Sequence, residues 1–435
     1  MWRKRIQLTM IHAAVAITLV PITSTLNRVM IKELGISAAL VAALVSFPYL
    51  LSPLQMAIGS YADRHPIWGR RRLPYIMFGL VLCIFGAILA PSAAYAFAGS
   101  WQGGLLLGAL AFGAWGIGFN LASVAYFSLA SELTDPAGRG TTTAVMFFGM
   151  ILAIIVTAIT VGRIVDPYTP EALYRAFGVA CAMAAVLGGL GLIRLEQPIT
   201  AASVSSERHT LNEIMKAVLD NPQARLFFVY LFLLLAAILG QDVLLEPYAG
   251  EAFNLSVSVT TRITSIWGTC VLLTIAIAGF LQSRLSKKVV AQWGGWGAAA
   301  GFALITGSGL IASQPVFYTG VVLLGLGTGL ATVSNVSLML DMTAAERVGL
   351  FIGAWGMAQA FSRLAGSMLG GVVRDVATAA LGSKALGYVI VFAIETLMLV
   401  VSLALLGRID TTAFQKRVEA VSPLDAAALM GESQV

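Results

Sequence analysis

The stretch "SLASELTDPAGRG" (Ser128–Gly140) recurs without gaps as "SLMLDMTAAERVG" (Ser337–Gly349) in the second half of the chain. The same register places Asp166 opposite Asp375. A repeat that spans this much sequence indicates that the chain consists of two related halves.

Two further matches extend the repeat toward the start of each half. "GSYADR" at 59–64 matches "GFLQSR" at 279–284, and "NRVMIKELGIS" runs parallel to "EPYAGEAFNLS". The second of these matches places Asn27 opposite Glu246.

The composition fixes the class of protein in which this repeat occurs. Of 435 residues, 58% are hydrophobic and only 11% are charged, whereas soluble domains carry about 25% charged residues. Apolar runs long enough to cross a membrane number about twelve. They begin near residues 8, 37, 73, 103, 141, 172, 225, 258, 289, 315, 350 and 385.

Six spans, a polar linker and six related spans resemble the plan of the major facilitator superfamily. We therefore expect an all-α polytopic membrane protein with twelve transmembrane helices in two pseudo-symmetric six-helix bundles and a central cavity between them. The predicted parts are an N-terminal bundle at 1–194, a cytoplasmic linker at 195–224, a C-terminal bundle at 225–407 and a cytoplasmic tail at 408–435.

The distribution of basic residues predicts the orientation of the chain. Most of the 27 Lys and Arg residues fall on the side that holds both termini and the linker. Excess Lys and Arg mark the cytoplasmic side, so we expect both termini in the cytoplasm. The same rule explains the net charge of +6 without nucleic acid as a partner.

The loop after the second span carries a pattern shared by many transporters of this superfamily. Its members here are Gly59, Asp63, Gly69, Arg70 and Arg71. A carboxylate at a helix end beside a basic cluster can form a breakable cytoplasmic latch between the bundles. The alternative is a basic loop that only sets topology.

Span seven carries charges that hydrocarbon disfavours. Asp242 and Glu246 are four residues apart in "LGQDVLLEPYAGE", and an ionisable group at mid-membrane costs about 2.5–3.5 kcal/mol on insertion scales. The spacing places both on one helix face, with Arg28 of span one as the expected partner. One interpretation is a buried ion pair that closes the outer side of the cavity. The other is a polar binding or gating site, and the two are compatible.

The last two spans carry one unexpected charge each, Arg363 and Glu395. They can pair with each other, or Glu395 can face a partner helix in the bilayer. The spacings Gly325–Gly329 and Gly366–Gly370 allow helices to approach closely. Packing within the bundle is the first interpretation of these glycines, and docking of a partner is the second.

Four stretches together resemble the bacteriochlorophyll delivery family, which includes PucC- and LhaA-type assembly factors of light-harvesting complexes. They are "TSTLNRVMIKELGIS", "GSYADRHPIWGRRRLPYI", "GQDVLLEPYAGEAFNLSVSVTTRITSIWG" and "DMTAAERVGLFIGAWGMAQAFSRLAGSMLGGVVRD". The resemblance covers about Thr23 to Gly407. It implies a role in antenna assembly, with delivery of (bacterio)chlorophyll in a bacterial cytoplasmic or intracytoplasmic photosynthetic membrane. The implied partners are light-harvesting antenna polypeptides, the reaction-centre/antenna core complex and chlorophyll synthase.

The residues limit how such a protein can hold pigment. The chain has three histidines, and only His12 enters a span, where it is either interfacial or a pigment ligand. Few histidines favour transient carriage of bacteriochlorophyll or chlorophyll over a permanent antenna. Oxygen ligands can also serve magnesium. The cavity and pigment candidates are Asn27, Asn120, Gln241, Tyr248 and His12.

The rival function is proton-coupled transport of a small amphipathic solute, with Asp242, Glu246 and Glu395 as proton sites. An enzyme finds little support, because no catalytic triad, metal cluster or phosphate-binding loop occurs at the required spacing. We predict no catalytic residues and no metal site. The three cysteines lie far apart and predict no disulfide.

Overall fold

The computed structural model describes residues 2–52, 54–134, 138–196, 218–282, 284–342 and 348–414. The regular elements in these ranges are helices, together with one isolated β-bridge between Ile67 and Arg70. Ten of the helices are long and apolar enough to cross a membrane. Two further segments complete the count of membrane passes in the described residues, from ten to twelve. They are the broken segment Ala38–Arg64 and the glycine-rich helix α13 (Lys287–Leu310). The predicted twelve-span plan is confirmed.

The first half contains six passes in the described residues. Span one is α1 (Trp2–Val20), continued by π-helical turns η1 (Pro21–Leu26) and η2 (Val29–Glu33). Span two is broken into α2 (Ala38–Val45), α3 (Phe47–Leu50) and α4 (Leu54–Arg64). Spans three to six are α5 (Leu73–Gly99), α6 (Trp101–Glu132), α7 (Arg139–Ile164) and α8 (Pro170–Leu192).

The second half repeats this order. Span seven is α10 (Pro222–Gly240), a 3₁₀ turn η4 (Gln241–Val243) and α11 (Leu245–Phe253). Spans eight to twelve are α12 (Val257–Gln282), α13, α14 (Gln314–Asp341), α15 (Val348–Leu381) and α16 (Lys384–Arg408).

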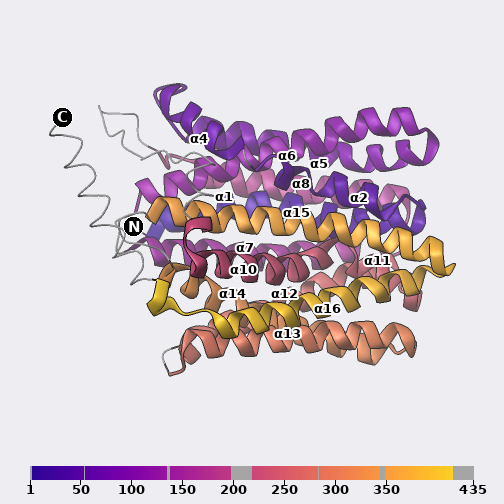
Figure 1. Ribbon diagram of the computed structural model, residues 1–435. Coiled ribbons are helices and arrows are strands. Elements are labelled where there is room, and N and C mark those ends of the chain that lie inside the picture. Colours follow the sequence, from indigo (N-terminus) through magenta and orange to yellow (C-terminus); the bar gives the residue numbers. More distant parts are fainter. Residues whose placement is uncertain are drawn as a thin grey trace, which may run out of the picture.

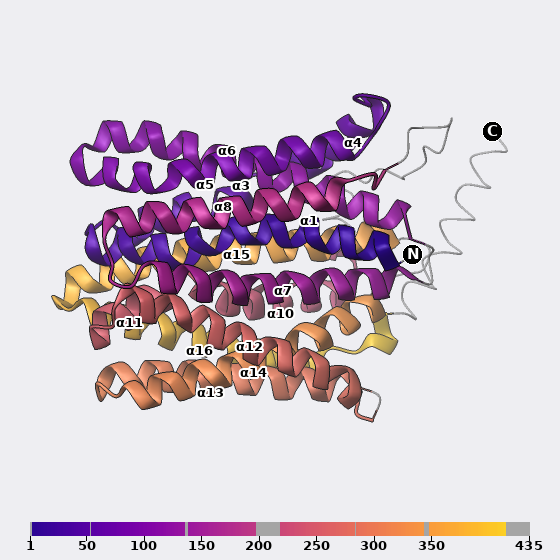
Figure 2. The same cartoon turned by 180° about the vertical axis from the view of Figure 1, so that it is seen from behind.

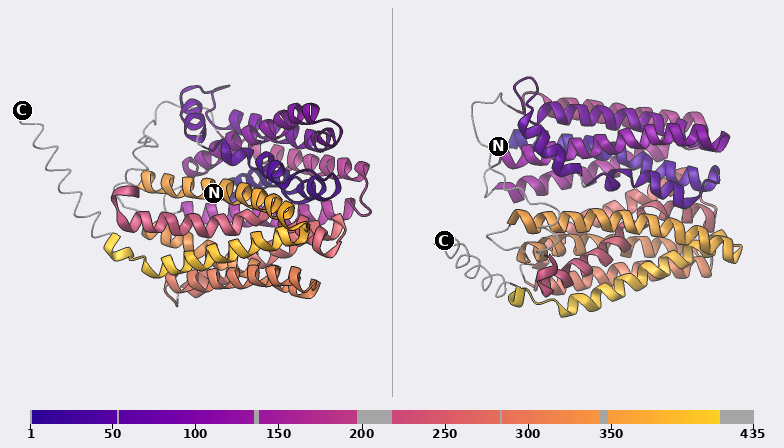
Figure 3. Two further views of the ribbon diagram at one scale, coloured as in Figure 1. Left: turned by 45° about the vertical axis from the view of Figure 1, so that its right-hand side comes forward. Right: turned by 45° about the horizontal axis from the view of Figure 1, so that its top comes forward.

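Helices of each half pack mainly on one another, as the colours of Figures 1 and 3 show. In the first half α5 packs on α6, and α1 packs on α7 and α8. In the second half α14 packs on α12 and α13, and α10 packs on α15. Two helix pairs make the most extensive contacts between the halves. Helix α15 packs on α2 on the side seen in Figure 1, and α12 packs on α7 on the side seen in Figure 2.

The two ends of the molecule hold different segments of the chain. The terminal face is the end that holds Trp2, the loop 65–72 and Arg408, and the opposite face holds Glu33 and Leu381. The linker at 195–224 and the tail at 408–435 lie largely outside the described residues, so their predicted boundaries remain predictions.

Glycines explain how closely the helices approach within each half. A Cβ on Gly325 would lie 2.9 Å from the carbonyl oxygen of Trp267 on α12, and Gly329 is equally tight against Val271. Gly366 lies against the backbone of Ala236 on α10. The predicted use of these glycine spacings in packing within the bundle is therefore confirmed.

Candidate functional site at the interface of the two halves

Helix breaks in spans one and seven meet at the interface. Span one leaves regular α-helix at Pro21, and span seven does so at Gln241. Asn27, which is fully buried, donates from Nδ2 to the carbonyl oxygens of Asp242 (3.2 Å) and Val243 (3.0 Å). A break in a membrane helix leaves carbonyl groups that need donors. Asn27 supplies them from the other half.

Asp242 forms an ion pair with Arg363 of α15. Gln241 also donates to Asp242, from Nε2 to Oδ1 at 2.9 Å. The Arg363 guanidinium lies 4.8 Å from the ring centre of Tyr49 on α3, in the first half. The side chains of Asp242 and Arg363 are 19% and 22% exposed, so the ion pair is half-buried. Through its contact with Tyr49, Arg363 also reaches span two of the other half.

The predicted pairing of Arg363 with Glu395 is therefore wrong. Glu395 is 4% exposed, and its Oε2 atom has no hydrogen-bond partner among the described residues. Its Oε1 atom lies 3.0 Å from the position that a Cβ on Gly240 would occupy. The tight crossing of α10 and α15 encloses this carboxyl group within the second half. Because the group is enclosed, Glu395 does not face a partner helix in the bilayer, and the prediction of docking through this side chain is also wrong.

Glu246 has a different environment from Asp242, although the two are four residues apart. Its Oε1 atom accepts a hydrogen bond from Thr264 of α12, and its Oε2 atom has no partner within the described part of the chain. The hydroxyl groups of Thr25 and Thr261, 3.1 Å apart, form a hydrogen bond that joins η1 to the same helix α12. Asp242 lies in the 3₁₀ turn and contacts α15, whereas Glu246 lies in α11 and contacts α12, so the prediction that they share one helix face is wrong.

Arg28 is buried, at 1% exposed, but its carboxylate partner is Glu33. Its Nη1 atom lies 2.5 Å from Glu33 Oε1, and its Nη2 atom donates to the carbonyl of Leu255 at 2.9 Å. The predicted pairing of Arg28 with Glu246 or Asp242 is therefore wrong. The π-helical turn at 29–33 brings Glu33 back toward Arg28. In a regular α-helix, two residues five positions apart lie on different faces.

Asn120 and Tyr248 lie in the packed interior of their own halves. Asn120 donates to the carbonyl of Pro48 at 2.8 Å and accepts from Gln55 at 2.6 Å, which ties α6 to the broken span two. Tyr248 donates to the carbonyl of Ile305 on α13 at 2.9 Å. Both side chains support the fold of one half and take no part in the contacts between the halves described above.

The side chain of His12 is buried within the protein, at 5% exposed. Its role as an interfacial residue or a pigment ligand remains a prediction. His12 lies among Tyr126, Phe127 and Phe147, with ring centres 5.1–5.4 Å away. Its Nδ1 atom has no hydrogen-bond partner in the ranges that the structure describes. His12 thus lies in an aromatic pocket between α1, α6 and α7 of the first half.

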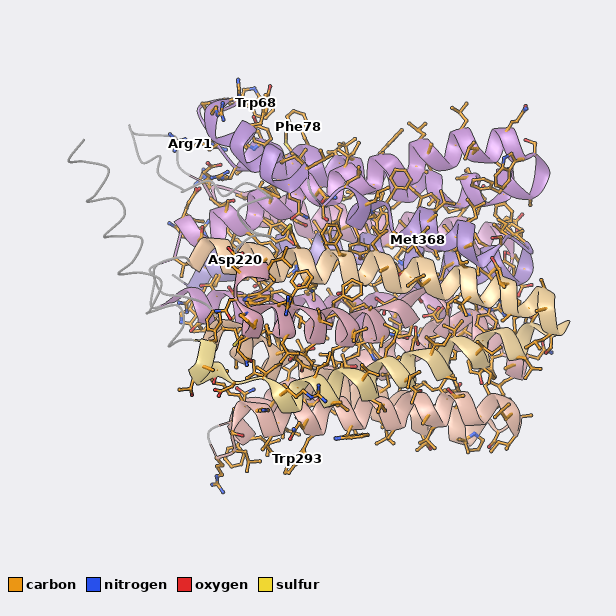
Figure 4. The ribbon with its side chains drawn as sticks, in the orientation of Figure 1. Trp68, Arg71, Phe78, Asp220, Trp293 and Met368 are labelled. Carbon is orange, nitrogen blue, oxygen red and sulfur yellow. The ribbon has the colours of Figure 1, made fainter. Side chains whose placement is uncertain are left out.

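The basic loop at the terminal face bonds within its own half. Glu196 accepts hydrogen bonds from the backbone N–H groups of Arg71 (2.9 Å) and Arg72 (3.1 Å), and Arg72 pairs with Glu132 at 2.8 Å. Arg70 forms the β-bridge with Ile67. Trp68 packs on Phe78 of α5 near this loop (Figure 4). The side chain of Asp63 lies outside the described residues, so the latch there remains a prediction.

Several interface residues escape sequence reasoning. Thr264, Thr261 and Tyr49 are common in membrane helices and carry no charge. The run "VTTRITS" of span eight does place hydroxyls at a spacing of three, and this spacing was a usable signal for a polar helix face. Within the described residues no group of three His, Cys, Asp or Glu side chains can hold a metal ion.

Solved structures share this architecture. A bacterial homologue of the human lysosomal transporter Spinster, inward-facing and occupied, aligns with a TM-score of 0.73 at 12% identity, covering 94% of this chain and 97% of that one. A point mutant of the nucleoside transporter NupG aligns at 0.69 and 16% identity, covering 93% and 99%. The D-xylose–proton symporter aligns at 0.67 and 15% identity, covering 95% and 99%. The class is thus a membrane protein with the major facilitator superfamily fold.

The chain belongs to the PUCC protein family, whose model matches residues 25–414. It is 30% identical over 443 residues to "Uncharacterized protein in puhA-bchM intergenic region" of Rhodobacter capsulatus, covering 96% of this chain and 92% of the relative. It is 29% identical over 417 residues to "Protein PucC" of the same organism, covering 92% and 90%. It is also 28% identical over 407 residues to "Bacteriochlorophyll synthase 44.5 kDa chain" of R. capsulatus, covering 92% and 94%.

Proposed function

We propose that this protein is an assembly factor for photosynthetic light-harvesting complexes, which binds (bacterio)chlorophyll transiently and delivers it to antenna polypeptides. The observation that carries the proposal is the match to the PUCC family over residues 25–414. The name of one relative refers to bacteriochlorophyll, which supports a pigment as the cargo. The proposed partners are antenna polypeptides, the reaction-centre/antenna core complex and chlorophyll synthase.

The proposed location is a bacterial cytoplasmic or intracytoplasmic photosynthetic membrane, with both termini in the cytoplasm. The lipid bilayer suits a cargo that is itself insoluble in water. A helper of this kind need not move the pigment across the membrane, because a lateral hand-off suffices. We propose a non-catalytic role, supported by a fold shared with transporters.

We propose that the pigment-binding site lies at the interface of the two halves, around Asp242 and Arg363. Charged groups inside membrane proteins are costly and are retained mainly where function needs them. This pair lies beside breaks in spans one, two and seven, and broken helices near mid-membrane are where transporters of related design bind their cargo. A cavity at this interface, with Asn27 and Gln241 beside it, is part of the proposal.

A deletion strain tests the proposal. We expect antenna polypeptides to fall while pigment synthesis continues, with each of antenna, free pigment and reaction centres quantified separately. The wild-type gene and Glu171→Gln, a change at an exposed carboxylate, should restore antenna assembly, whereas Asp242→Asn should restore it poorly. Normal antenna assembly in the deletion strain, with no second copy of the gene present, would reject the assembly role.

The second candidate is proton-coupled transport of a small amphipathic solute. The buried carboxylates Glu246 and Glu395 and the half-buried Asp242 support it, as does the likeness in fold to a proton symporter. The same strain separates the two functions. A solute transporter predicts normal antenna levels together with altered uptake or efflux of a solute in membrane vesicles.

A further inference from the structure

Two aspartates at the opposite face each reach across the interface to the start of a helix in the other half. Asp375 of α15 accepts hydrogen bonds from the Ser37 hydroxyl (2.8 Å) and the Ala39 backbone N–H (2.9 Å) at the start of α2. Asp166, which follows α7, accepts from the Ser258 hydroxyl (3.1 Å) at the start of α12. A carboxylate at a helix N-terminus meets free N–H groups and the positive end of the helix dipole.

The two contacts lie at equivalent positions of the repeat, although their donor atoms differ. The repeat that places Ser128 opposite Ser337 also places Asp166 opposite Asp375. On the other side of each contact, Ala39, whose backbone N–H donates to Asp375, matches Ser258, whose hydroxyl donates to Asp166. The same register of "NRVMIKELGIS" and "EPYAGEAFNLS" places Ser37 opposite Ser256. Both serines cap their helices, because Ser37 Oγ accepts from Leu40 N at 3.3 Å and Ser256 Oγ accepts from Val259 N at 3.4 Å.

A glycine four residues before each aspartate is also repeated. A Cβ on Gly371 would lie 2.7 Å from the carbonyl oxygen of Ala38, and a Cβ on Gly162 would lie 3.3 Å from that of Ser258. Each glycine therefore lets its helix approach the start of the partner helix. The aspartate and the glycine together form one contact between the halves, and this contact occurs once in each half at equivalent positions.

We propose that Asp166 and Asp375 are two repeat-related latches that hold the halves closed at the opposite face, and that both release when the halves separate there. This conformational device goes beyond the assembly role. Each latch is made of hydrogen bonds and charge across a small contact area, which can break and re-form without unfolding either half.

The two latches differ in strength. Asp375 also accepts from the Ala38 backbone N–H (3.2 Å) across the interface. Arg374 of its own helix orients the carboxylate (2.8 Å), and the Asp375 side chain is 24% exposed. The side chain of Asp166 is 56% exposed, and its second contact is a longer ion pair with Arg262 at 3.7 Å. The latch at Asp375 should therefore hold more firmly, and the α7–α12 side should open first.

The test is a distance measurement across the opposite face by pulsed electron paramagnetic resonance. Spin labels go on cysteines introduced at the exposed positions Gln102, at the start of α6, and Gln314, at the start of α14. The native cysteines Cys83, Cys181 and Cys270 are buried. The wild-type protein should show mainly the short distance of the closed face.

Asp375→Asn should move the equilibrium toward a longer-distance population on the order of tenfold, because charge-assisted hydrogen bonds are lost. Gly371→Ala should act in the same direction while leaving the charge intact, and Asp166→Asn should act more weakly. Glu171→Gln, an exposed carboxylate at the same face, should match the wild type.

The side chain of Asp166 is exposed, so we expect Asp166→Asn to fold. Its distance distribution tests the proposal if the other variants are unstable. The proposal is overturned if every folded latch variant gives the distance distribution of the wild type. It is also overturned if Glu171→Gln shifts the distribution as far as Asp375→Asn.

Discussion

Asp242 and Glu246 are two carboxylates four residues apart in one membrane span, yet they are neutralised in different ways. Asp242 meets a guanidinium, that of Arg363, and a side-chain amide, that of Gln241. Glu246 meets the hydroxyl of Thr264 and leaves one oxygen without a partner among the described residues. Asp242 lies in the 3₁₀ turn and Glu246 in the α-helix that follows it. The two side chains contact different helices, so spacing in a sequence predicts a shared face only where the helix is unbroken.

The difference predicts that the Asp242 pair is energetically the more sensitive of the two. Arg363→Leu should destabilise the protein toward the lower end of the range of about 3–5 kcal/mol known for breaking a buried pair, because it strands Asp242. The double variant Asp242→Leu/Arg363→Leu should cost less than the sum of the single variants. Thermal unfolding in detergent measures each effect. Simple additivity would show that the two groups are not coupled.

The break in span seven gives the next largest effect. Asn27→Ala removes the donor for two buried carbonyl groups, those of Asp242 and Val243. Each buried group left without a partner costs about 1–3 kcal/mol. The same unfolding measurement applies, with the exposed change Glu171→Gln as control. A loss no larger than that of the control would mean that water replaces the amide at the break.

Glu246 should be less sensitive than Asp242. Glu246→Gln keeps an acceptor for Thr264 and removes a charge that pairs with no cation in the described ranges, so the expected change in stability is below about 1 kcal/mol. Asp242→Asn, in contrast, leaves the half-buried Arg363 beside a neutral group. Equal losses of folded yield for these two variants would remove the distinction drawn between the carboxylates.

The smallest expected effect concerns Arg28. Its partner is Glu33, which is 35% exposed, so solvent screens part of the attraction. A double-mutant cycle of Arg28→Gln with Glu33→Gln should show a coupling energy of about 1 kcal/mol or less, and the cycle of Arg28→Gln with Glu246→Gln should show less still. A larger coupling between Arg28 and Glu246 would restore the partnership expected from the sequence.

The sequence predicted the fold well for physical reasons. Membrane spans depend directly on local composition, and twelve apolar runs show that composition in the sequence. The repeat at Ser128 and Ser337 indicated the two halves, and the regularly spaced glycines indicated close helix packing. The charged residues inserted into spans, such as Asp242 and Arg363, were also visible because they are rare there.

The pairing of those charges was not visible. It depends on the π-helical turns at 21–33 and the 3₁₀ turn at 241–243, which rotate side chains by amounts that a regular helix does not allow. Both expected pairings therefore changed: Arg28 pairs with Glu33 and not with Glu246 or Asp242, and Arg363 pairs with Asp242 and not with Glu395. Among the uncharged partners, Tyr49 gave no distinguishing signal, and the hydroxyl spacing of Thr261 and Thr264 indicated only a polar helix face.

The most direct measurement is the content of the protein after gentle purification from its native membrane. Absorbance spectroscopy would quantify bound (bacterio)chlorophyll, and mass spectrometry would identify polypeptides that purify with it. The account predicts pigment in less than one equivalent per chain together with antenna polypeptides, and a clear loss of both in Asp242→Asn but not in Glu171→Gln. A preparation of folded protein that contains neither pigment nor antenna polypeptides would contradict it.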